Sequence, residues 1–151
     1  MARKTTRREF LKQSLSAGAG LLFLKSWAKG QSPNDKLNIA VIGVGGRGWD
    51  NLRGVAGENI VALCDVDLEK LSAAATVFPN ARLWVDYRRM FDKQKDIDAV
   101  VISTPDHTHA LPMILALQLG KHVYCEKPLV HTVWEARQVR EAARKAKVAT
   151  Q

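Results

Sequence analysis

Three of the four glycines in residues 43–48 place the tightest constraint on how this chain can fold. They form the pattern Gly43-x-Gly45-x-x-Gly48 directly after the almost continuously apolar run 37–42. Glycine permits a tight turn at the first position, close approach of a pyrophosphate at the second, and close packing of a helix on a strand at the third. The start of such a helix faces an anion with free N–H groups. The pattern therefore predicts a strand, a helix and, between them, a phosphate-binding turn made by Gly43, Gly45, Gly46, Arg47 and Gly48.

An acidic residue in the expected place strengthens this interpretation against the alternative that the glycines merely turn the chain. Asp65 closes the apolar run 60–64 and lies 22 residues after the first glycine of the pattern. A carboxylate there accepts hydrogen bonds from the adenosine ribose and repels a 2′-phosphate, which favours NAD over NADP. Asp67 is an alternative, although its position is more typical of a helix cap. Arg47 keeps NADP open, because a guanidinium near the loop can pair with a phosphate.

Short apolar runs alternate with helical patterns along residues 37–151. Runs that are apolar on both faces suit a parallel sheet that is covered by helices on both sides. The order of the runs predicts an α/β domain over residues 37–151, with a Rossmann doubly wound parallel sheet. The expected strands are 37–42, 60–64, 99–102 and 122–125, and the expected helices are 68–78, 108–119 and 133–146.

Several single residues agree with this division. Thr132, with Glu135 three positions later, predicts a capping box at the start of a helix. Gly120 stands where a helix that ends at residue 119 needs a left-handed residue. Cys64 and Cys125 fall on strands that are not neighbours in the usual Rossmann order, so we expect two buried free thiols and no disulfide.

The first thirty residues have the pattern of an export signal. They hold seven of the 23 lysines and arginines but one of the 15 acids, so the remainder carries 16 − 14 = +2 of the net charge of +8. This distribution argues against nucleic acid as a partner. The segment Thr6-Arg7-Arg8-Glu9-Phe10-Leu11-Lys12 resembles the twin-arginine consensus, and the apolar stretch 15–24 that follows is too short to span a bilayer. We therefore expect a twin-arginine signal peptide at 1–30, a linker at 31–36, the export machinery as a partner and a periplasmic location.

A different interpretation of the leader is a basic amphipathic helix that lies on a membrane. Gly18, Gly20 and the neighbouring serines interrupt any continuous apolar stripe, which counts against this alternative.

Two further segments carry motifs that resemble those of one protein family. They are Ser103-Thr104-Pro105-Asp106-His107-Thr108-His109-Ala110 and Gly120-Lys121-His122-Val123-Tyr124-Cys125-Glu126-Lys127-Pro128-Leu129. Together with the glycine pattern and Asp65, they resemble the Gfo/Idh/MocA family of oxidoreductases, over residues 37–151 and over that family's N-terminal half alone. The resemblance implies an NAD(P)-dependent enzyme that moves a hydride between a sugar or polyol and the nicotinamide ring.

The resemblance also implies site residues. Glu126, Lys127 and Pro128 lie beside the nicotinamide in that family, with Lys127 and Glu126 as the catalytic pair and the Lys127–Pro128 bond as a candidate cis peptide. Thr104, Pro105 and His109 line the cofactor cleft. His107 and His109 lack the acidic or cysteine ligands of a metal site, so we expect no catalytic metal.

The resemblance covers the N-terminal half of that family and not its second domain. The family's second domain closes the substrate pocket and mediates homo-oligomerisation, and no residues here correspond to it. We expect a domain truncated at its C-terminal end and inactive alone. Two other functions stay open, namely an NAD-dependent glycosidase of related fold, which the Glu126–Pro128 motif disfavours, and a non-catalytic nucleotide-binding module.

Overall fold

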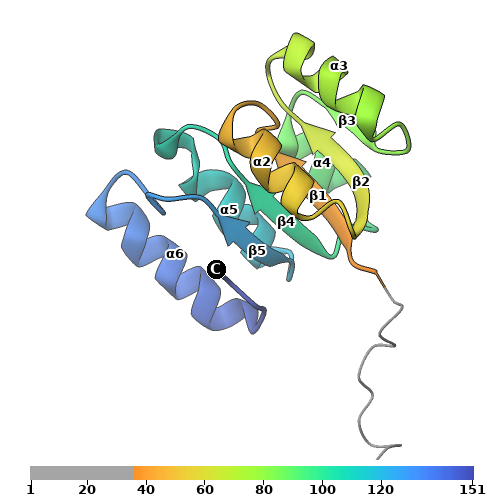
Figure 1. Cartoon of the computed structure of the whole chain (residues 1–151). Coiled ribbons are helices and arrows are strands. Elements are labelled where there is room, and N and C mark those ends of the chain that lie inside the picture. The colour runs from red at the N-terminus through yellow and green to blue at the C-terminus, as the bar shows by residue number, and fades with distance from the viewer. Residues whose placement is uncertain (1–35) are drawn as a thin grey trace, which may run out of the picture. The chain divides into compact units, whose positions relative to one another are not determined.

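The computed structural model describes residues 36–151, so the predicted signal peptide at 1–30 and most of the predicted linker at 31–36 lie outside the described residues. Strands and helices alternate along these residues (Figure 1). The strands are β1 (Asn38–Ile42), β2 (Asn59–Cys64), β3 (Arg82–Trp84), β4 (Ala99–Ile102) and β5 (His122–Cys125). The helices are α2 (Arg47–Gly54), α3 (Leu68–Val77), α4 (Tyr87–Lys93), α5 (Ala110–Gln118) and α6 (Val133–Ala146), with a 3₁₀ turn at Asp106–Thr108.

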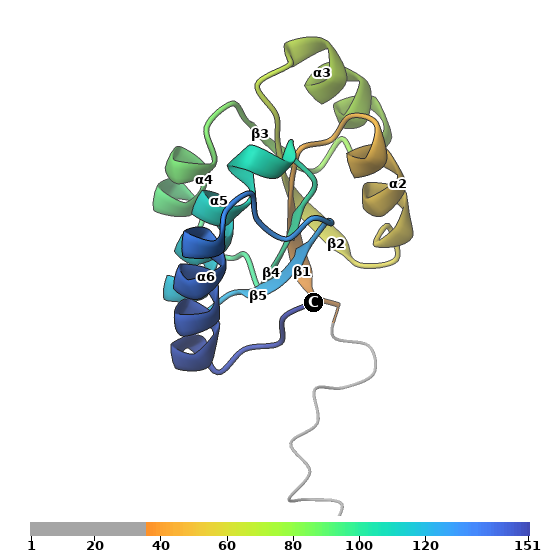
Figure 2. The same ribbon diagram turned by 90° about the vertical axis from the view of Figure 1, so that its left-hand side faces the viewer.

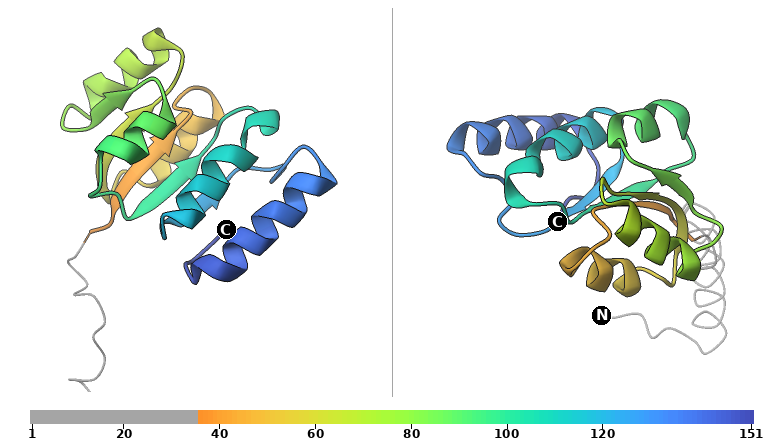
Figure 3. Two further views of the ribbon diagram at one scale, coloured as in Figure 1. Left: turned by 180° about the vertical axis from the view of Figure 1, so that it is seen from behind. Right: turned by 90° about the horizontal axis from the view of Figure 1, so that it is seen from above.

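The five strands form one parallel sheet in the order β3-β2-β1-β4-β5. Figure 2 shows the sheet almost on edge, with α2 and α3 on one face and α4, α5 and α6 on the other. Figure 3 shows the same two layers from behind and from above. The predicted Rossmann doubly wound sheet is therefore confirmed.

The apolar runs are continuous because each central strand is buried on both faces. Along β1, Ile39 and Val41 pack in the cluster beneath α2 and α3, whereas Ala40 and Ile42 pack in the cluster beneath α4, α5 and α6. Successive side chains on a strand point to opposite faces. A run that reads as apolar at every position is thus what a two-sided cover requires.

The predicted strands and helices are present, with small shifts at their ends. Helix 108–119 begins two residues later than expected, at Ala110, because residues 106–108 form the separate 3₁₀ turn. The sequence did not predict β3 or α4. The capping box of Thr132 and Glu135, the left-handed Gly120 (φ 69°) and the cap of Asp67 on α3 are confirmed.

The two cysteines are buried and free, as expected. Cys64 is aligned with Ile42, Ile42 with Ile102, and Ile102 with Cys125, so two strands separate the thiols. Burial raises the pKa of each thiol to about 12, which keeps both protonated.

Beyond α6 the chain returns to the sheet beside β5. The N–H of Gln151 donates to the carbonyl oxygen of Val123 and its carbonyl oxygen accepts from the N–H of Cys125, each at 2.9 Å. The bridge between Val123 and Thr150 is parallel, like the pairing of the strands in the sheet. None of the helices within residues 36–151 is long and apolar enough to cross a membrane.

Candidate functional site

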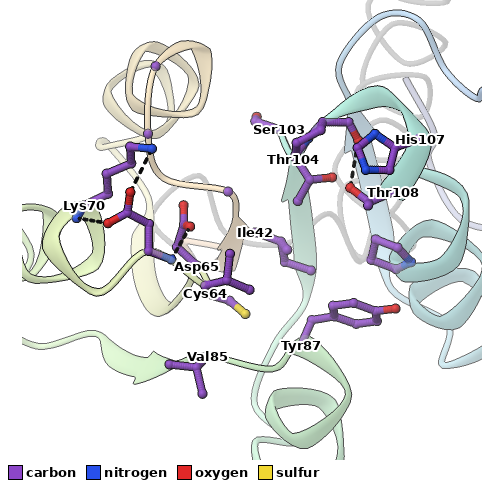
Figure 4. A pocket seen from close by; sticks show the side chains of 17 residues that line it. Ile42, Cys64, Asp65, Lys70, Val85, Tyr87, Ser103, Thr104, His107 and Thr108 are labelled. Atoms are coloured by element: carbon purple, nitrogen blue, oxygen red, sulfur yellow. Dashed lines mark hydrogen bonds and ion pairs between the residues drawn. The ribbon is translucent and has the colours of Figure 1, made fainter.

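A cavity of about 720 Å³ opens where the C-terminal ends of β1, β2, β3 and β4 meet their loops (Figure 4). This is the edge of a doubly wound sheet at which such folds bind ligands. Six of the predicted cofactor residues line it: Gly43, Gly45, Gly46, Asp65, Thr104 and Pro105. Tyr87, Val85 and Val66 add apolar surface that the sequence analysis did not assign to the site.

The first and third glycines are required by close packing. A Cβ on Gly43, whose φ is 84°, would lie 2.7 Å from the backbone C and O of Ser103. A Cβ on Gly48 would lie against the carbonyl oxygen of Gly43 and 3.2 Å from Cβ of Ser103. The two glycines therefore let β1, α2 and the end of β4 meet without intervening side chains, as the motif predicts.

The Asp65 carboxylate is fixed at the mouth of this cavity. Its Oδ2 accepts a hydrogen bond from the N–H of Val44 at 2.8 Å, and its Oδ1 accepts one from the N–H of Asp67 at 3.0 Å. Each carboxylate oxygen can accept more than one hydrogen bond. Asp65 is therefore oriented by the backbone and retains acceptor capacity for a ligand hydroxyl.

Lys70 is a lining residue that sequence reasoning missed. Its aliphatic chain lies over Gly45, because a Cβ on that glycine would meet Cδ of Lys70 and lie 3.0 Å from Cε. Its Nζ is 2.9 Å from Oδ2 of Asp67, which raises the pKa of Lys70 and lowers that of Asp67. Among the lining residues, Lys70 is the only lysine or arginine.

A second group of residues gathers at the end of β5. Glu126 is buried, and its Oε1 accepts from Nδ2 of Asn51 and Nε of Arg47, each at 2.9 Å, and from the hydroxyl of Tyr124 at 3.2 Å. Its Oε2 accepts from the N–H of Lys127 at 3.2 Å. The hydrogen bonds from Asn51 and Arg47 lower the pKa of Glu126 to about 2. This carboxylate is therefore ionised at neutral pH.

His109 joins the two groups of residues. The ring is 1% exposed, with Nδ1 2.8 Å from the carbonyl oxygen of Pro128 and Nε2 2.6 Å from that of Thr104. Both partners are carbonyl acceptors, so a neutral ring donates to one of them at a time. This buried side chain lies between the loops after β4 and β5 and contacts both. The Lys127–Pro128 peptide bond is cis, and both residues are exposed.

The structure divides the predicted site residues between the cavity and the end of β5. The other six predicted residues do not line the cavity: Arg47, Gly48, His109, Glu126, Lys127 and Pro128. His109, which was expected to line the cofactor cleft, is instead buried behind it. Arg47, whose guanidinium left NADP open as an alternative, lies 2.9 Å from Oε1 of Glu126, with Asp50 at 3.8 Å. Asn51 and Lys70 were missed because each reads in the sequence as an ordinary polar residue on a helix.

The donors and acceptors at the cavity fit a dinucleotide. Oγ1 of Thr104 is buried and has no hydrogen-bond partner within residues 36–151. In the same part of the chain, the N–H groups of Gly45 and Gly46 donate to no backbone carbonyl. A buried polar group without a partner needs a ligand or water to satisfy it. By contrast, residues 36–151 hold no cluster of three or more His, Cys, Asp or Glu that could bind a metal ion.

Residues 37–151 match the model of the Gfo/Idh/MocA oxidoreductases, described as an oxidoreductase family with an NAD-binding Rossmann fold. The chain belongs to this family. Its cofactor is NAD, and solved relatives carry NAD or NADH. Among curated relatives, an inositol 2-dehydrogenase of Salmonella typhimurium is 33% identical over 72% of this chain and 34% of its own length.

A glycosyl hydrolase family 109 protein of Solibacter usitatus is 33% identical over 94% of this chain and 38% of its own length. Among solved structures, myo-inositol 2-dehydrogenase of Lactobacillus plantarum superposes with a TM-score of 0.70, at 27% identity, over 77% of this chain and 36% of that one. The WlbA dehydrogenase of Bordetella pertussis, in complex with NADH and UDP-GlcNAcA, gives 0.69 at 27% identity, over 76% and 36%. The chain thus spans about a third of the length of its relatives.

Proposed function

We propose that this chain is the nucleotide-binding half of an NAD(P)-dependent oxidoreductase that acts on a sugar or polyol. The observation that carries the proposal is the link between the two groups of residues. His109 connects the loop that lines the cavity with the loop that holds Glu126, Lys127 and Pro128. The adenosine and nicotinamide ends of a dinucleotide are far apart. The residues that bind the two ends must therefore be held in fixed positions relative to each other.

In this proposal each part of the cofactor has a partner in the chain. The carboxylate of Asp65 accepts hydrogen bonds from the adenosine ribose, and the N–H groups of Gly45 and Gly46 face the pyrophosphate. The hydroxyl of Thr104, which lacks a partner among the described residues, donates to or accepts from the ligand. Bound NAD supplies a hydride acceptor at C4 of the nicotinamide.

The proposed roles of Lys127 and Glu126 differ. Lys127 is exposed. In its proposed role, its amine exchanges a proton with the reacting hydroxyl of the substrate. Glu126 is ionised and accepts hydrogen bonds from three side chains. It therefore suits orientation of the loop and of the N–H of Lys127 better than donation of a proton.

The binding part of the proposal is tested by titrating NAD⁺ and NADP⁺ into the purified chain by calorimetry. Asp65→Ser removes the acceptor for the ribose hydroxyl, so the preference for NAD⁺ over NADP⁺ should fall about tenfold. Asp92→Ser, on the exposed side of α4, is the matched control. An unchanged ratio for Asp65→Ser would remove Asp65 from the ribose site.

The catalytic part needs the protein at the full length of its relatives. Lys127→Ala should lower the turnover of a sugar or polyol far more than it weakens NAD⁺ binding, because Lys127 serves the reacting hydroxyl. Lys93→Ala, on α4, is the control. Equal losses in binding and turnover would assign the Glu126–Pro128 segment a structural role, and NAD⁺ binding without turnover of any sugar would favour a non-catalytic module.

A second candidate is an NAD-dependent glycosidase, in which the cofactor returns unchanged. The similarity to the glycosyl hydrolase family 109 protein over 94% of this chain favours it. Nitrophenyl glycosides distinguish the two candidates at full length. A glycosidase would release nitrophenol without net NADH, whereas a dehydrogenase forms NADH from a free sugar.

We also propose that residues 1–30 direct twin-arginine export to the periplasm. The segment Thr6–Lys12, with Arg7 and Arg8 at its centre, supports this. Replacing both arginines with lysine keeps the charge and should leave the protein in the cytoplasm in a cell-fractionation assay. Unchanged periplasmic yield would contradict the assignment.

A further inference from the structure

We propose that Asn51 is a positioning residue that fixes the nicotinamide end of the site relative to the phosphate-binding loop. The inference rests on the proposed oxidoreductase function, in which Glu126, Lys127 and Pro128 lie beside the nicotinamide ring. It assigns a role to a side chain that neither the glycine motif nor the Glu126–Pro128 motif includes.

The side-chain amide of Asn51 joins three elements. Its Nδ2 donates to Oγ of Ser103 at 2.9 Å and to Oε1 of Glu126 at 2.9 Å. Ser103 directly follows β4, Glu126 directly follows β5, and Asn51 itself lies in α2. An NH₂ group has two hydrogens. Both are used, so the side chain has one arrangement that satisfies it.

The part of α2 that carries Asn51 is closely packed against its neighbours. Gly48 and Asn51 are three residues apart and so lie on the same face of α2. Gly48 brings that face against Ser103, since a Cβ there would be 3.2 Å from Cβ of Ser103. Leu52, the next residue in α2, is fully buried. The helix and the end of β4 therefore form a fixed surface, and Asn51 extends it to Glu126.

The two donors that α2 offers to Glu126 differ in their exposure. The side chain of Arg47 is 65% exposed, whereas that of Glu126 is 10% exposed. Asn51 is half-buried and is also anchored to Ser103, which Arg47 is not. Without Asn51, the side-chain hydrogen bonds left to the carboxylate of Glu126 would come from the exposed guanidinium of Arg47 and from the hydroxyl of Tyr124, neither of which joins it to the end of β4. The N–H of Lys127, which bonds to the same carboxylate, would then lose its orientation.

The adenosine end should not respond to this change. The hydrogen bonds of the Asp65 carboxylate come from the N–H groups of Val44 and Asp67, and Asn51 does not line the cavity around it. Loss of Asn51 should therefore affect the nicotinamide end selectively. A residue with a merely structural role would weaken both ends together.

The experiment compares NAD⁺ with ADP-ribose, which lacks the nicotinamide, by calorimetric titration of the same chain. Asn51→Leu should weaken NAD⁺ about tenfold, as expected for loss of a hydrogen bond to a charged group, and leave ADP-ribose binding unchanged. Asn59→Leu, at the exposed start of β2, is the matched control and should change neither ligand. If Asn51→Leu does not fold, as judged by circular dichroism, Asn51→Asp keeps the size, replaces both donors with a carboxylate that repels Glu126, and should give a selective loss at least as large.

Equal losses for both ligands, or no loss for either, would overturn the positioning role of Asn51. A different result distinguishes failure of the proposed function. If the unsubstituted chain binds NAD⁺ no better than ADP-ribose, the nicotinamide has no site at Glu126–Pro128, and both proposals fall. If it prefers NAD⁺ and Asn51→Leu retains that preference, only the role of Asn51 falls.

Discussion

Replacement of Gly48 by alanine tests the packing on which the phosphate-binding loop depends. The added Cβ would lie against the carbonyl oxygen of Gly43 and 2.8 Å from its carbonyl carbon. Ordinary van der Waals contact begins at 3.4 Å, so the start of α2 must move by at least 3.4 − 2.8 = 0.6 Å. The neighbouring atoms are backbone and cannot rotate away.

The expected cost follows from this displacement. Overpacking of this kind costs about 1–3 kcal/mol, whereas Gly→Ala in an unobstructed helix gains about 0.5–1 kcal/mol. Gly54, in the same helix, has nothing within 4 Å of its Cβ position, so Gly54→Ala is the matched control. The two variants should differ by about 1.5–4 kcal/mol in the free energy of unfolding.

The measurement is urea unfolding of both variants, followed by NAD⁺ titration of the folded proteins. Gly48→Ala should unfold at a lower urea concentration and bind NAD⁺ more weakly, because the N–H groups at the start of α2 are displaced. Gly54→Ala should match or exceed the stability of the unsubstituted chain and bind normally. Equal stabilities for the two variants would refute the argument that Gly48 is required by the approach of α2 to β1.

Three more results are expected. The pKa of Glu126 lies at about 2, below its ordinary 4.5. The contribution of this carboxylate to stability is therefore complete above pH 4.5 and is lost as pH falls toward 2. The difference in urea midpoint between the unsubstituted chain and Glu126→Gln should be smaller at pH 3 than at pH 6. Thr132→Ala removes the side-chain cap of α6 and should cost about 1 kcal/mol in thermal unfolding, with Thr132→Ser largely restoring it. Alkylation in denaturant without reductant should label both Cys64 and Cys125, and a single disulfide-linked species in mass spectrometry would contradict the strand order.

The sequence predicts those parts of the site that depend on local backbone geometry. The turn at Gly43 and the acid at Asp65 each follow directly from where a strand ends, and both are where the motif requires them. The parts that sequence reasoning missed depend on distant neighbours. Asn51 meets its partners 52 and 75 residues along the chain. No local pattern identifies such a residue.

Residues 82–93 show the corresponding limit for the fold. Strand β3 has three residues, two of them exposed, so it shows neither alternation nor an apolar run. Helix α4 has seven residues and buries only Met90 and Phe91. Such short elements are formed by tertiary packing more than by their own pattern, and the sequence therefore did not reveal them.

The brevity of β3 has a consequence for how the molecule behaves at high concentration. An edge strand offers unpaired N–H and C=O groups to any other chain, and a long, flat, apolar edge invites aggregation. Here the edge is three residues long and begins with a charged arginine. Its last residue, Trp84, is tied inward, because the indole donates to Gln94, whose own amide donates to the carbonyl oxygen of Val61 in β2. A variant with a longer β3, or with Gln94 replaced, would therefore be expected to expose unpaired backbone groups along this edge. Strands of other molecules could then pair with them.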